Sequence, residues 1–556
     1  MNHEGKCTTK HTNGARLSRA AAGKPARCRS ETPHAGRFGS WSEAASHRVG
    51  RGRPARLAFL LLAMLLASVA GAAPAARPNI ILIMVDDMGW SDIGCYGGEV
   101  DTPNLDRLAR EGLRFTQFYN NAKCTTTRAS LVTGLYPRRQ GGLLKQNMVT
   151  FGEVLREAGY HTSLSGKWHL GSGDKVHPFH RGFDSYYGLL DGCCNFFDPT
   201  RPDPAYKGGH VREFGQDDRR ITEFPKGFYT TDAFTDHAIA SMRRFASDDR
   251  PFFLHICYTA PHYPLHAKPE DTAKYRGRFK HGWEVLRRER YQRQLEMGLF
   301  DAGQWPLSGT DSEAYDWATA DQDFEDLRMA VYAAMIDCVD QNIGRLVAAL
   351  KETGQADRTA IFFLSDNGGC SEEPGGRDPA KRHPGPVDDY VAVGPAWGWA
   401  QNAPFRRYKS WVNEGGISTP MIAWYPGVVK PGTITSQPGH IIDFMPTFVE
   451  LAGATYPEAY KGHEILPMEG LSLLPILQGK SRPEPEFLAW EWAGNRAYRK
   501  GDWKVVWDKL VKEWELYDLA SDRTETRNLA GAQPDRTRAL SEAWTQWARR
   551  TGLVEQ

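Results

Sequence analysis

Apolar runs alternate with amphipathic stretches along most of the chain that follows Arg77. Runs that are apolar at nearly every position are typical of strands buried on both faces of a parallel sheet. They occur at residues 79–85, 252–258, 360–366 and 419–426, with a shorter strand-like segment at 161–166. Stretches with helical spacing lie between or beside them, at residues 102–112, 151–160, 326–354 and 443–453. This alternation predicts an α/β fold with a doubly wound, mostly parallel sheet flanked by helices.

The pattern changes after about residue 456. Residues 495–508 and 512–531 have the pattern of short antiparallel strands joined by turns, and a helix is predicted over 536–550. We therefore expect a main domain at 77–455 and a small C-terminal α+β subdomain, an antiparallel sheet plus a helix, at 456–556. Residues 193–225 and 268–322 are rich in Pro, Asp and Gly or in charge. Such insertions are suited to covering a functional face.

The first 76 residues have the features of an export leader. Three arginines at 51–56 precede an apolar run and then small residues, which together span 57–76. This order is typical of a secretory signal peptide, with cleavage near Ala70 or Ala72. We expect an exported, periplasmic or extracellular protein without a membrane span in the mature chain; an uncleaved anchor is the alternative. The polar residues before this run, residues 1–50 or so, are expected to be disordered. Alternatively, the start codon is assigned upstream of the true one, which would lie near Val49.

Charge and cysteine content exclude several classes of protein. The formal net charge is +2, but residues 1–76 contain 12 Lys and Arg against 3 Asp and Glu, so the rest of the chain carries −7. A mildly acidic body without a basic patch argues against nucleic-acid binding. Seven cysteines follow the leader. An odd number leaves at least one thiol unpaired, and the absence of CxxC spacing argues against zinc.

Two predicted strands end in oxygen-bearing side chains. Asp86 and Asp87 follow the run at 79–85, and Asp366 and Asn367 follow the run at 360–365. Ligands of doubly wound folds bind at the carboxyl ends of the strands. Three carboxylates and an amide are hard ligands suited to Ca²⁺ or Mg²⁺. The alternative is that these residues only begin turns or cap helices.

Cys124 lies where a polar segment turns into an apolar helix. The sequence "CTTTRASLVTG" begins with hydroxyl residues and ends in an apolar run closed by Thr-Gly. This pattern places Cys124 near a helix N-terminus, where the helix field favours an anion. Arg128, one turn further on, could hold a modified Cys124 or an anionic substrate. The alternative is a buried structural cysteine.

The segment from Cys124 to Gly134 resembles the signature of the type I, formylglycine-dependent sulfatases. That signature is Cys-x-Pro-x-Arg with a downstream Thr-Gly, and Thr126 stands here in the place of the proline. Further segments match the family in the family's order: "VDDMGWSDIGCYG" (85–97), "GKWHLG" (166–171), "APHYPLHA" (260–267), "SDNGG" (365–369), "YKSWVNEGGISTPMI" (408–422) and "ELYDLASDRTETRNLA" (515–530). The resemblance covers roughly Arg77 to Leu529. It implies an arylsulfatase-like sulfuric ester hydrolase of the alkaline phosphatase superfamily.

The resemblance also implies a cofactor set and a maturation partner. In this family a formylglycine-generating enzyme or its equivalent oxidises the cysteine to formylglycine, which here would be Cys124. The implied metal is Ca²⁺, with Mg²⁺ as the alternative. Its implied ligands are Asp86, Asp87, Asp366, Asn367 and the modified Cys124. The implied substrate is a sulfated small molecule or saccharide.

Family roles in catalysis fall on the modified Cys124 and on five further residues of this chain. Arg128 would hold the modified Cys124. Lys167, His262 and Lys409 would surround the sulfate oxygens, because fixed cations stabilise the charge that spreads over them in the transition state. His262 would protonate the leaving oxygen, and His169 would accept the proton whose loss regenerates the aldehyde. If the segment at 166–171 continued a strand, Lys167 and His169 would share one of its faces.

Two other functions remain compatible with these residues. Related phosphodiesterases and phosphonate monoester hydrolases share the fold and the metal geometry, although "GKWHLG" and "APHYPL" favour a sulfatase. A protein that binds sulfated glycans without turnover would result if Cys124 stayed a thiol.

Overall fold

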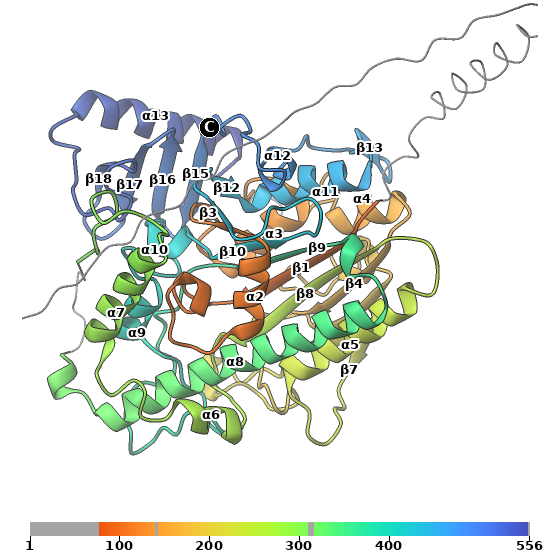
Figure 1. Ribbon diagram of the computed structural model, residues 1–556, viewed down its shortest axis with the longest axis horizontal. Helices are drawn as coiled ribbons and strands as arrows, with labels where there is room; N and C mark the ends of the chain where they lie inside the picture. The colour runs from red at the N-terminus through yellow and green to blue at the C-terminus, as the bar shows by residue number, and fades with distance from the viewer. Residues whose placement is uncertain (1–76, 139–142, 310–315, 554–556) are drawn as a thin grey trace, which may run out of the picture. The chain divides into compact units, whose positions relative to one another are not determined.

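A ten-stranded sheet forms the centre of the main domain in the part of the chain that the structure describes (Figure 1). The structure is a computed structural model and describes residues 77–138, 143–309 and 316–553, so the expected leader lies outside it. The strand order is β11-β2-β10-β9-β1-β8-β4-β5-β6-β7. These strands are β1 (Asn79–Asp86), β2 (Leu113–Phe115), β4 (His161–Gly166), β5 (Ser185–Leu189), β6 (Phe214–Gln216), β7 (Arg219–Ile221), β8 (Phe252–Pro261), β9 (Thr359–Ser365), β10 (Met421–Trp424) and β11 (Thr433–Thr435). The five central strands from β9 to β5 are parallel, which confirms the predicted doubly wound α/β class.

Helices cover both faces of this sheet (Figure 1). Alternate residues of β1 show this directly, since Ile81 and Ile83 belong to one apolar cluster while Ile80 and Leu82 belong to another. The first cluster includes residues of α2 (Pro103–Glu111), α5 (Thr230–Phe245) and α8 (Gln322–Glu352). The second includes residues of α3 (Cys124–Thr133), α4 (Phe151–Glu157), α11 (Phe444–Ala452) and α12 (Leu474–Leu477). Burial of both faces explains why the strands are apolar at successive positions.

The segments that were expected to be insertions contain regular structure of their own. Residues 268–309 include α6 (Pro269–Tyr275) and α7 (Trp283–Glu296), and residues 193–225 include β6 and β7 at one edge of the sheet. Short elements complete this part: α9 (Pro395–Gln401), α10 (Glu414–Ile417), and the two-stranded pairs β3 (Phe118–Tyr119) with β12 (Gly439–His440) and β13 (Ala459–Tyr460) with β14 (His463–Glu464). None of the helices in the described part of the chain has the length and apolar character that crossing a bilayer requires.

Two local expectations need refinement. β10 pairs antiparallel with β9, although its apolar run has the same pattern as the parallel strands. β4 ends at Gly166, so Lys167 and His169 do not continue a strand and do not share a strand face. The backbone leaves the extended conformation here, with φ of 114° at Gly166 and 59° at His169. The side chains of Lys167 and His169 therefore do not follow the alternation of a strand.

The C-terminal residues form a four-stranded antiparallel sheet packed against one helix. Its strands are β15 (Leu488–Trp492), β16 (Asn495–Lys500), β17 (Trp503–Asp508) and β18 (Glu513–Asp518), in sequence order, and the helix is α13 (Pro534–Arg550). Trp544 and Trp547 of this helix lie in the same apolar cluster as Val505 and Leu516. This arrangement confirms the predicted antiparallel sheet and helix.

Buried charges join this C-terminal sheet to α10. Lys504 Nζ donates to Glu414 Oε1 at 2.8 Å and to Glu525 Oε1 at 2.7 Å. Arg523 Nε donates to Glu414 Oε2 at 2.7 Å. All four side chains are fully buried. Each charge therefore depends on its partners rather than on water.

Lys504→Met should destabilise the protein by about 3–5 kcal/mol, because it leaves two buried carboxylates with one fewer cation. Urea denaturation followed by tryptophan fluorescence measures this loss. Lys500→Met is the matched control, since Lys500 is exposed at the end of β16, and should change stability by less than about 0.5 kcal/mol. Equal effects of the two substitutions would show that the buried charge network is not stabilising.

Candidate active site

The two strand ends that carry oxygen ligands meet at one place in the structure. β1 and β9 are adjacent and parallel, with Val85 paired to Ser365, so the residues that follow them come together. The backbone N–H of Asp87 donates to Asp366 Oδ1 at 3.2 Å. Asn367 Nδ2 donates to Asp87 Oδ1 at 2.8 Å. The sequence expectation that the pairs Asp86–Asp87 and Asp366–Asn367 form one cluster fits this geometry.

Helix α3 places Cys124 and Arg128 at the same cluster. Cys124 is the first residue of the helix and is buried. Arg128, one turn later, donates to Asp366 Oδ2 from Nε at 3.1 Å and from Nη2 at 2.8 Å. Thr126, which replaces the signature proline, donates its hydroxyl to the carbonyls of Asn121 and Lys123, each at 3.0 Å. The helix start is therefore well formed with threonine at this position.

Two lysines and a histidine close the cluster from other segments. Lys167 Nζ donates to Asp86 Oδ2 at 2.6 Å, just after β4. Lys409 Nζ donates to Asp87 Oδ2 at 2.7 Å, from the segment before α10. His262 Nε2 lies 3.4 Å from the same oxygen of Asp87, in the loop after β8. Each of these three side chains thus comes from a different loop at the carboxyl edge of the sheet, as expected for this fold.

His169 enters the cluster beside Gly192. A Cβ atom at Gly192 would lie 2.6 Å from the His169 ring, so only glycine leaves room for it. Nδ1 of His169 is buried and has no hydrogen-bond partner among the described residues. Burial, together with the charges of Lys167 and Arg128, lowers the pKa of His169 well below its usual value. The ring is therefore neutral near pH 7 and can accept a proton.

Charge and burial oppose each other strongly at the carboxylates. Burial and the neighbouring charge of Asp366 raise the pKa of Asp86 well above its usual value, although Lys167 and Arg128 act in the other direction. Burial also acts to raise the pKa of Asp87, but His262 and Lys409 outweigh it and lower that pKa. Burial raises the pKa of the Cys124 thiol, and the charges of Lys167 and Lys409 partly offset this. Unmodified Cys124 is therefore a neutral thiol near pH 7.

The oxygen atoms at the strand ends fit a hard divalent cation. Asp86 Oδ1 and Asn367 Oδ1 are both buried, and neither accepts a hydrogen bond within the described ranges. A buried acceptor without a partner is unfavourable by about 1–3 kcal/mol, and a bound cation would remove that cost. One ligand atom each from Asp86, Asp87 and His262 also lies within 4.8 Å of the others. His262 was expected to contact the substrate and was not among the expected metal ligands.

Three residues beside the cluster were not predicted from the sequence. Glu372 Oε1 forms an ion pair with Lys123 Nζ at 2.9 Å and lies 3.6 Å from Lys409 Nζ. The hydroxyl of Tyr263 donates to the other oxygen of Glu372. These side chains lie on irregular segments without a periodic pattern. The only available signal was proximity in sequence, since Glu372 follows Asn367 by five residues, Tyr263 follows His262 and Lys123 precedes Cys124.

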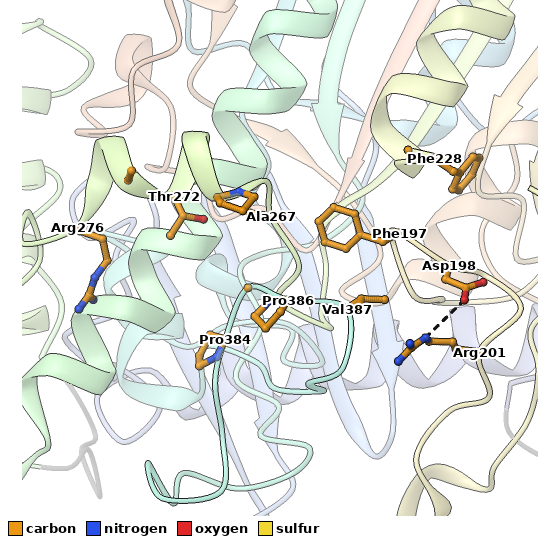
Figure 2. A pocket seen from close by; sticks show the side chains of 14 residues that line it. Phe197, Asp198, Arg201, Phe228, Ala267, Thr272, Arg276, Pro384, Pro386 and Val387 are labelled. Atoms are coloured by element: carbon orange, nitrogen blue, oxygen red, sulfur yellow. Dashed lines mark ion pairs between the residues drawn. The ribbon is translucent and has the colours of Figure 1, made fainter. Parts of the chain in front are cut away.

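A cavity lies between the two insertion segments, separate from the cluster of charged residues just described. It has a volume of about 780 Å³, and none of the predicted site residues lines it. Figure 2 shows the ring of Phe197 projecting into it between Phe228, Pro386 and Val387, with the Asp198–Arg201 ion pair at one side. Its walls come from both insertion segments, from residues 227, 228 and 267 next to them, and from residues 384–387. Residues of both insertions thus line this cavity, and none of the predicted site residues does.

Comparison with known proteins identifies the family of this chain. Residues 78–454 match the family described as "Sulfatase", and residues 405–546 match "N-sulphoglucosamine sulphohydrolase, C-terminal". The chain is similar to an uncharacterized sulfatase of Schizosaccharomyces pombe, at 34% identity with 87% of this chain and 95% of the relative covered. It is also similar to the arylsulfatase of Klebsiella aerogenes, at 32% identity with 76% and 96% covered.

A solved structure agrees with these relatives. The crystal structure of Ps i-CgsB in complex with k-i-k-neocarrahexaose superimposes with a TM-score of 0.62 at 27% identity, with 85% of this chain and 92% of that chain covered. The fold and the polar cluster at its carboxyl edge define a hydrolase of the alkaline phosphatase superfamily. The chain belongs to the sulfatase family and is a sulfatase, an enzyme that hydrolyses sulfate esters.

Proposed function

We propose that this sulfatase cleaves sulfate monoesters with a formylglycine made from Cys124 and with Ca²⁺ held by Asp86, Asp87, Asp366 and Asn367. The observation that carries the proposal is the position of Cys124. It begins a helix at the strand-end carboxylates, and the charges of two lysines, Lys167 and Lys409, act on it. A neutral, buried thiol is a poor nucleophile, whereas the hydrate of an aldehyde supplies one hydroxyl to attack sulfur and a second whose proton loss releases sulfate. Bound Ca²⁺ would supply positive charge that favours the ionised form of such a hydroxyl.

Lys167 and Lys409 would bind the sulfate group of the substrate. Both ammonium groups are buried, and each donates to a carboxylate at the strand ends. A cation on these carboxylates would compensate their charge, which leaves donors of both lysines for an anionic ester. Preorganised donors of this kind are worth on the order of 2.7–4 kcal/mol each in transition-state stabilisation. Arg128 would hold the residue at position 124 through its fixed contact with Asp366.

The two histidines would move protons in opposite directions. Each ring nitrogen of His262 faces an oxygen atom: Nδ1 faces the carbonyl oxygen of Tyr263, and Nε2 faces Asp87 Oδ2. This arrangement suits a ring that is protonated on both nitrogens. Burial lowers the pKa of His262 to about 3 although Asp87 lies beside the ring, so a further anion is needed before the ring takes up a second proton. A bound sulfate ester is such an anion, and His262 would then protonate the leaving oxygen. Neutral His169 would accept the proton that the second hydroxyl loses.

The substrate class and the route of maturation follow from the same proposal. The substrate would be a sulfated small molecule or saccharide, and a formylglycine-generating enzyme or its equivalent would convert Cys124. The crystal structure of the similar Ps i-CgsB contains a carrageenan-type hexasaccharide, which favours a saccharide. Export to the periplasm or the exterior is proposed from the leader sequence.

Conversion of Cys124 is tested by mass spectrometry of the peptide that contains it. We expect a mass about 18 Da below that of the thiol form, the change from cysteine to formylglycine. Purified protein should hydrolyse p-nitrophenyl sulfate much faster than bis-p-nitrophenyl phosphate. An unchanged thiol in protein that still turns over sulfate would contradict the mechanism. Preference for the phosphodiester would favour the phosphodiesterase alternative.

Cys124→Ala should lower kcat/KM for p-nitrophenyl sulfate by at least about 10³-fold, because it removes the nucleophile and leaves the rest of the site in place. Cys338→Ala is the matched control. Its thiol is also buried, but on α8 near Asp232 and Asn342, and activity should stay within about twofold. The melting curve of each variant checks its fold. Comparable activity of Cys124→Ala and wild type would exclude the nucleophile assignment.

Calcium should stabilise the protein, because the carboxylates at the strand ends repel each other when no cation is bound. At a free concentration of roughly 100 times Kd, the free energy of unfolding should rise by about 2.7 kcal/mol. Thermal unfolding in calcium and in chelator measures the shift. Asp86→Asn should reduce the calcium-dependent shift in unfolding temperature. Asp101→Asn, which alters an exposed carboxylate, should leave that shift unchanged. Identical melting curves with calcium and with chelator would rule out the metal site.

A further inference from the structure

A short, well-anchored turn stands at the rim of the buried cluster. The 3-10 helix η3 (Ala205–Lys207) lies within the insertion at 193–225 and ends at Gly208, whose φ is 97°. The N–H of Lys207 donates to Pro204 O at 2.8 Å. Asp203 at the base of the turn is buried and accepts from Arg212 Nε at 2.9 Å. The turn is therefore fixed to the protein body, which is what a preorganised binding element requires.

Lys207 points its ammonium group toward the active site. Its Nζ donates to Tyr263 Oη at 3.1 Å and lies 5.1 Å from the centre of that ring. The ring of Tyr263 packs on His262 with 4.2 Å between their centroids. Across the described residues, the only partner that the structure gives this ammonium is Tyr263, and no carboxylate lies within ion-pair distance of it. Lys207 thus holds an uncompensated positive charge one side chain away from a proposed catalytic histidine.

Tyr206 offers an aromatic surface beside this charge. Tyr206 is 52% exposed, although hydrogen bonds hold the turn that carries it. Its hydroxyl donates to Tyr390 O at 3.1 Å, and its ring meets Tyr390 edge-on at 6.4 Å between centroids. Tyr390 in turn packs on Tyr263 at 5.9 Å. The Arg382 guanidinium also lies 5.8 Å from the centre of the Tyr206 ring. The ring is therefore held in place while about half of the residue stays open to solvent, as in a platform for an apolar ligand face.

We propose that Tyr206 and Lys207 form a saccharide subsite beside the sulfate pocket. The ring of Tyr206 supports a sugar ring, and the ammonium of Lys207 binds a second anionic group of the same substrate. The subsite rests on the proposed function, because the scissile sulfate must occupy the buried cluster. It deepens that function by naming the substrate class, a sulfated saccharide that carries at least one further sulfate or carboxylate. A simple aryl sulfate would fill the buried cluster and leave the subsite empty.

Equilibrium binding tests the subsite without relying on turnover. All proteins in the isothermal titration calorimetry carry Cys124→Ala so that the ligand is not hydrolysed, and wild type here denotes that protein without a subsite substitution. Two pairs of ligands are compared, and one member of each pair carries an additional anionic group. One pair is glucosamine 6-O-sulfate and glucosamine N,6-O-disulfate. The other pair is N-acetylgalactosamine 6-O-sulfate and a disaccharide in which this sugar is linked to a uronate. We expect wild type to prefer the doubly charged member of at least one pair by about fivefold, and Lys207→Gln to abolish this preference.

Lys226→Gln is the matched control for Lys207→Gln, because Lys226 is exposed and directly follows the same insertion. It should leave the preference unchanged. The preference of wild type should shrink as salt increases, since the contact is a solvent-accessible ion pair. If wild type shows no preference in either pair, or if Lys207→Gln retains it, the subsite is refuted.

The aromatic platform has its own variants. Tyr206→Ala should weaken binding of the preferred saccharide by about fivefold, whereas Tyr206→Phe, which keeps the ring, should bind as wild type does. All three subsite variants should keep kcat/KM for p-nitrophenyl sulfate within about twofold, since that substrate does not reach the subsite. Equal loss in Tyr206→Phe and Tyr206→Ala would reject the platform. Loss of p-nitrophenyl sulfate turnover in Lys207→Gln would place Lys207 in the sulfate pocket instead. Failure of wild type on p-nitrophenyl sulfate would reject only the proposed chemistry.

Discussion

The site depends on holding three carboxylates together where little water reaches them. Asp86, Asp87 and Asp366 are all fully or almost fully buried at adjacent strand ends. Such a cluster is stable only if positive charge surrounds it, because buried like charges repel each other strongly. Three cations do this from three other segments: Arg128 on α3, Lys167 after β4 and Lys409 before α10. The charge balance therefore ties these segments to β1 and β9, and the same contacts that stabilise the fold also position the groups proposed for chemistry.

This dependence extends to the C-terminal sheet. Lys409 lies on a segment whose end, α10, is held by Lys504 and Arg523 through Glu414. The N–H of Gly368, just after the second strand end, donates to Gly416 O at 3.1 Å. Buried, directional contacts thus connect the C-terminal sheet to the end of the segment that carries Lys409. The C-terminal sheet is in this sense a support of the candidate active site and not a separate appendage.

The sequence predicted the parts of the site that follow regular structure. β1 and β9 were recognisable as apolar runs, and the oxygen-bearing residues after them had to meet because the strands are parallel and adjacent. The helix start at Cys124 was recognisable from the change from hydroxyl to apolar residues. Strand direction was not predictable, since β10 has the same apolar pattern as its parallel neighbours. Glu372 and Tyr263 were missed because their positions depend on irregular backbone, which leaves no period in the sequence.

Burial separates two kinds of recognition in this molecule. The lysines and carboxylates of the candidate active site are buried, and the charges of the lysines suit a sulfate whatever molecule carries it. Under the proposed function, specificity for the rest of the substrate comes from side chains that solvent reaches, such as those of the proposed subsite on the insertion at 193–225. Lys207 and Tyr206 connect the two regions, because Tyr263 contacts Lys207 on one side and packs on His262 on the other. If the proposed subsite binds substrate, variation in this insertion would change the preferred substrate while the buried charge balance stays intact.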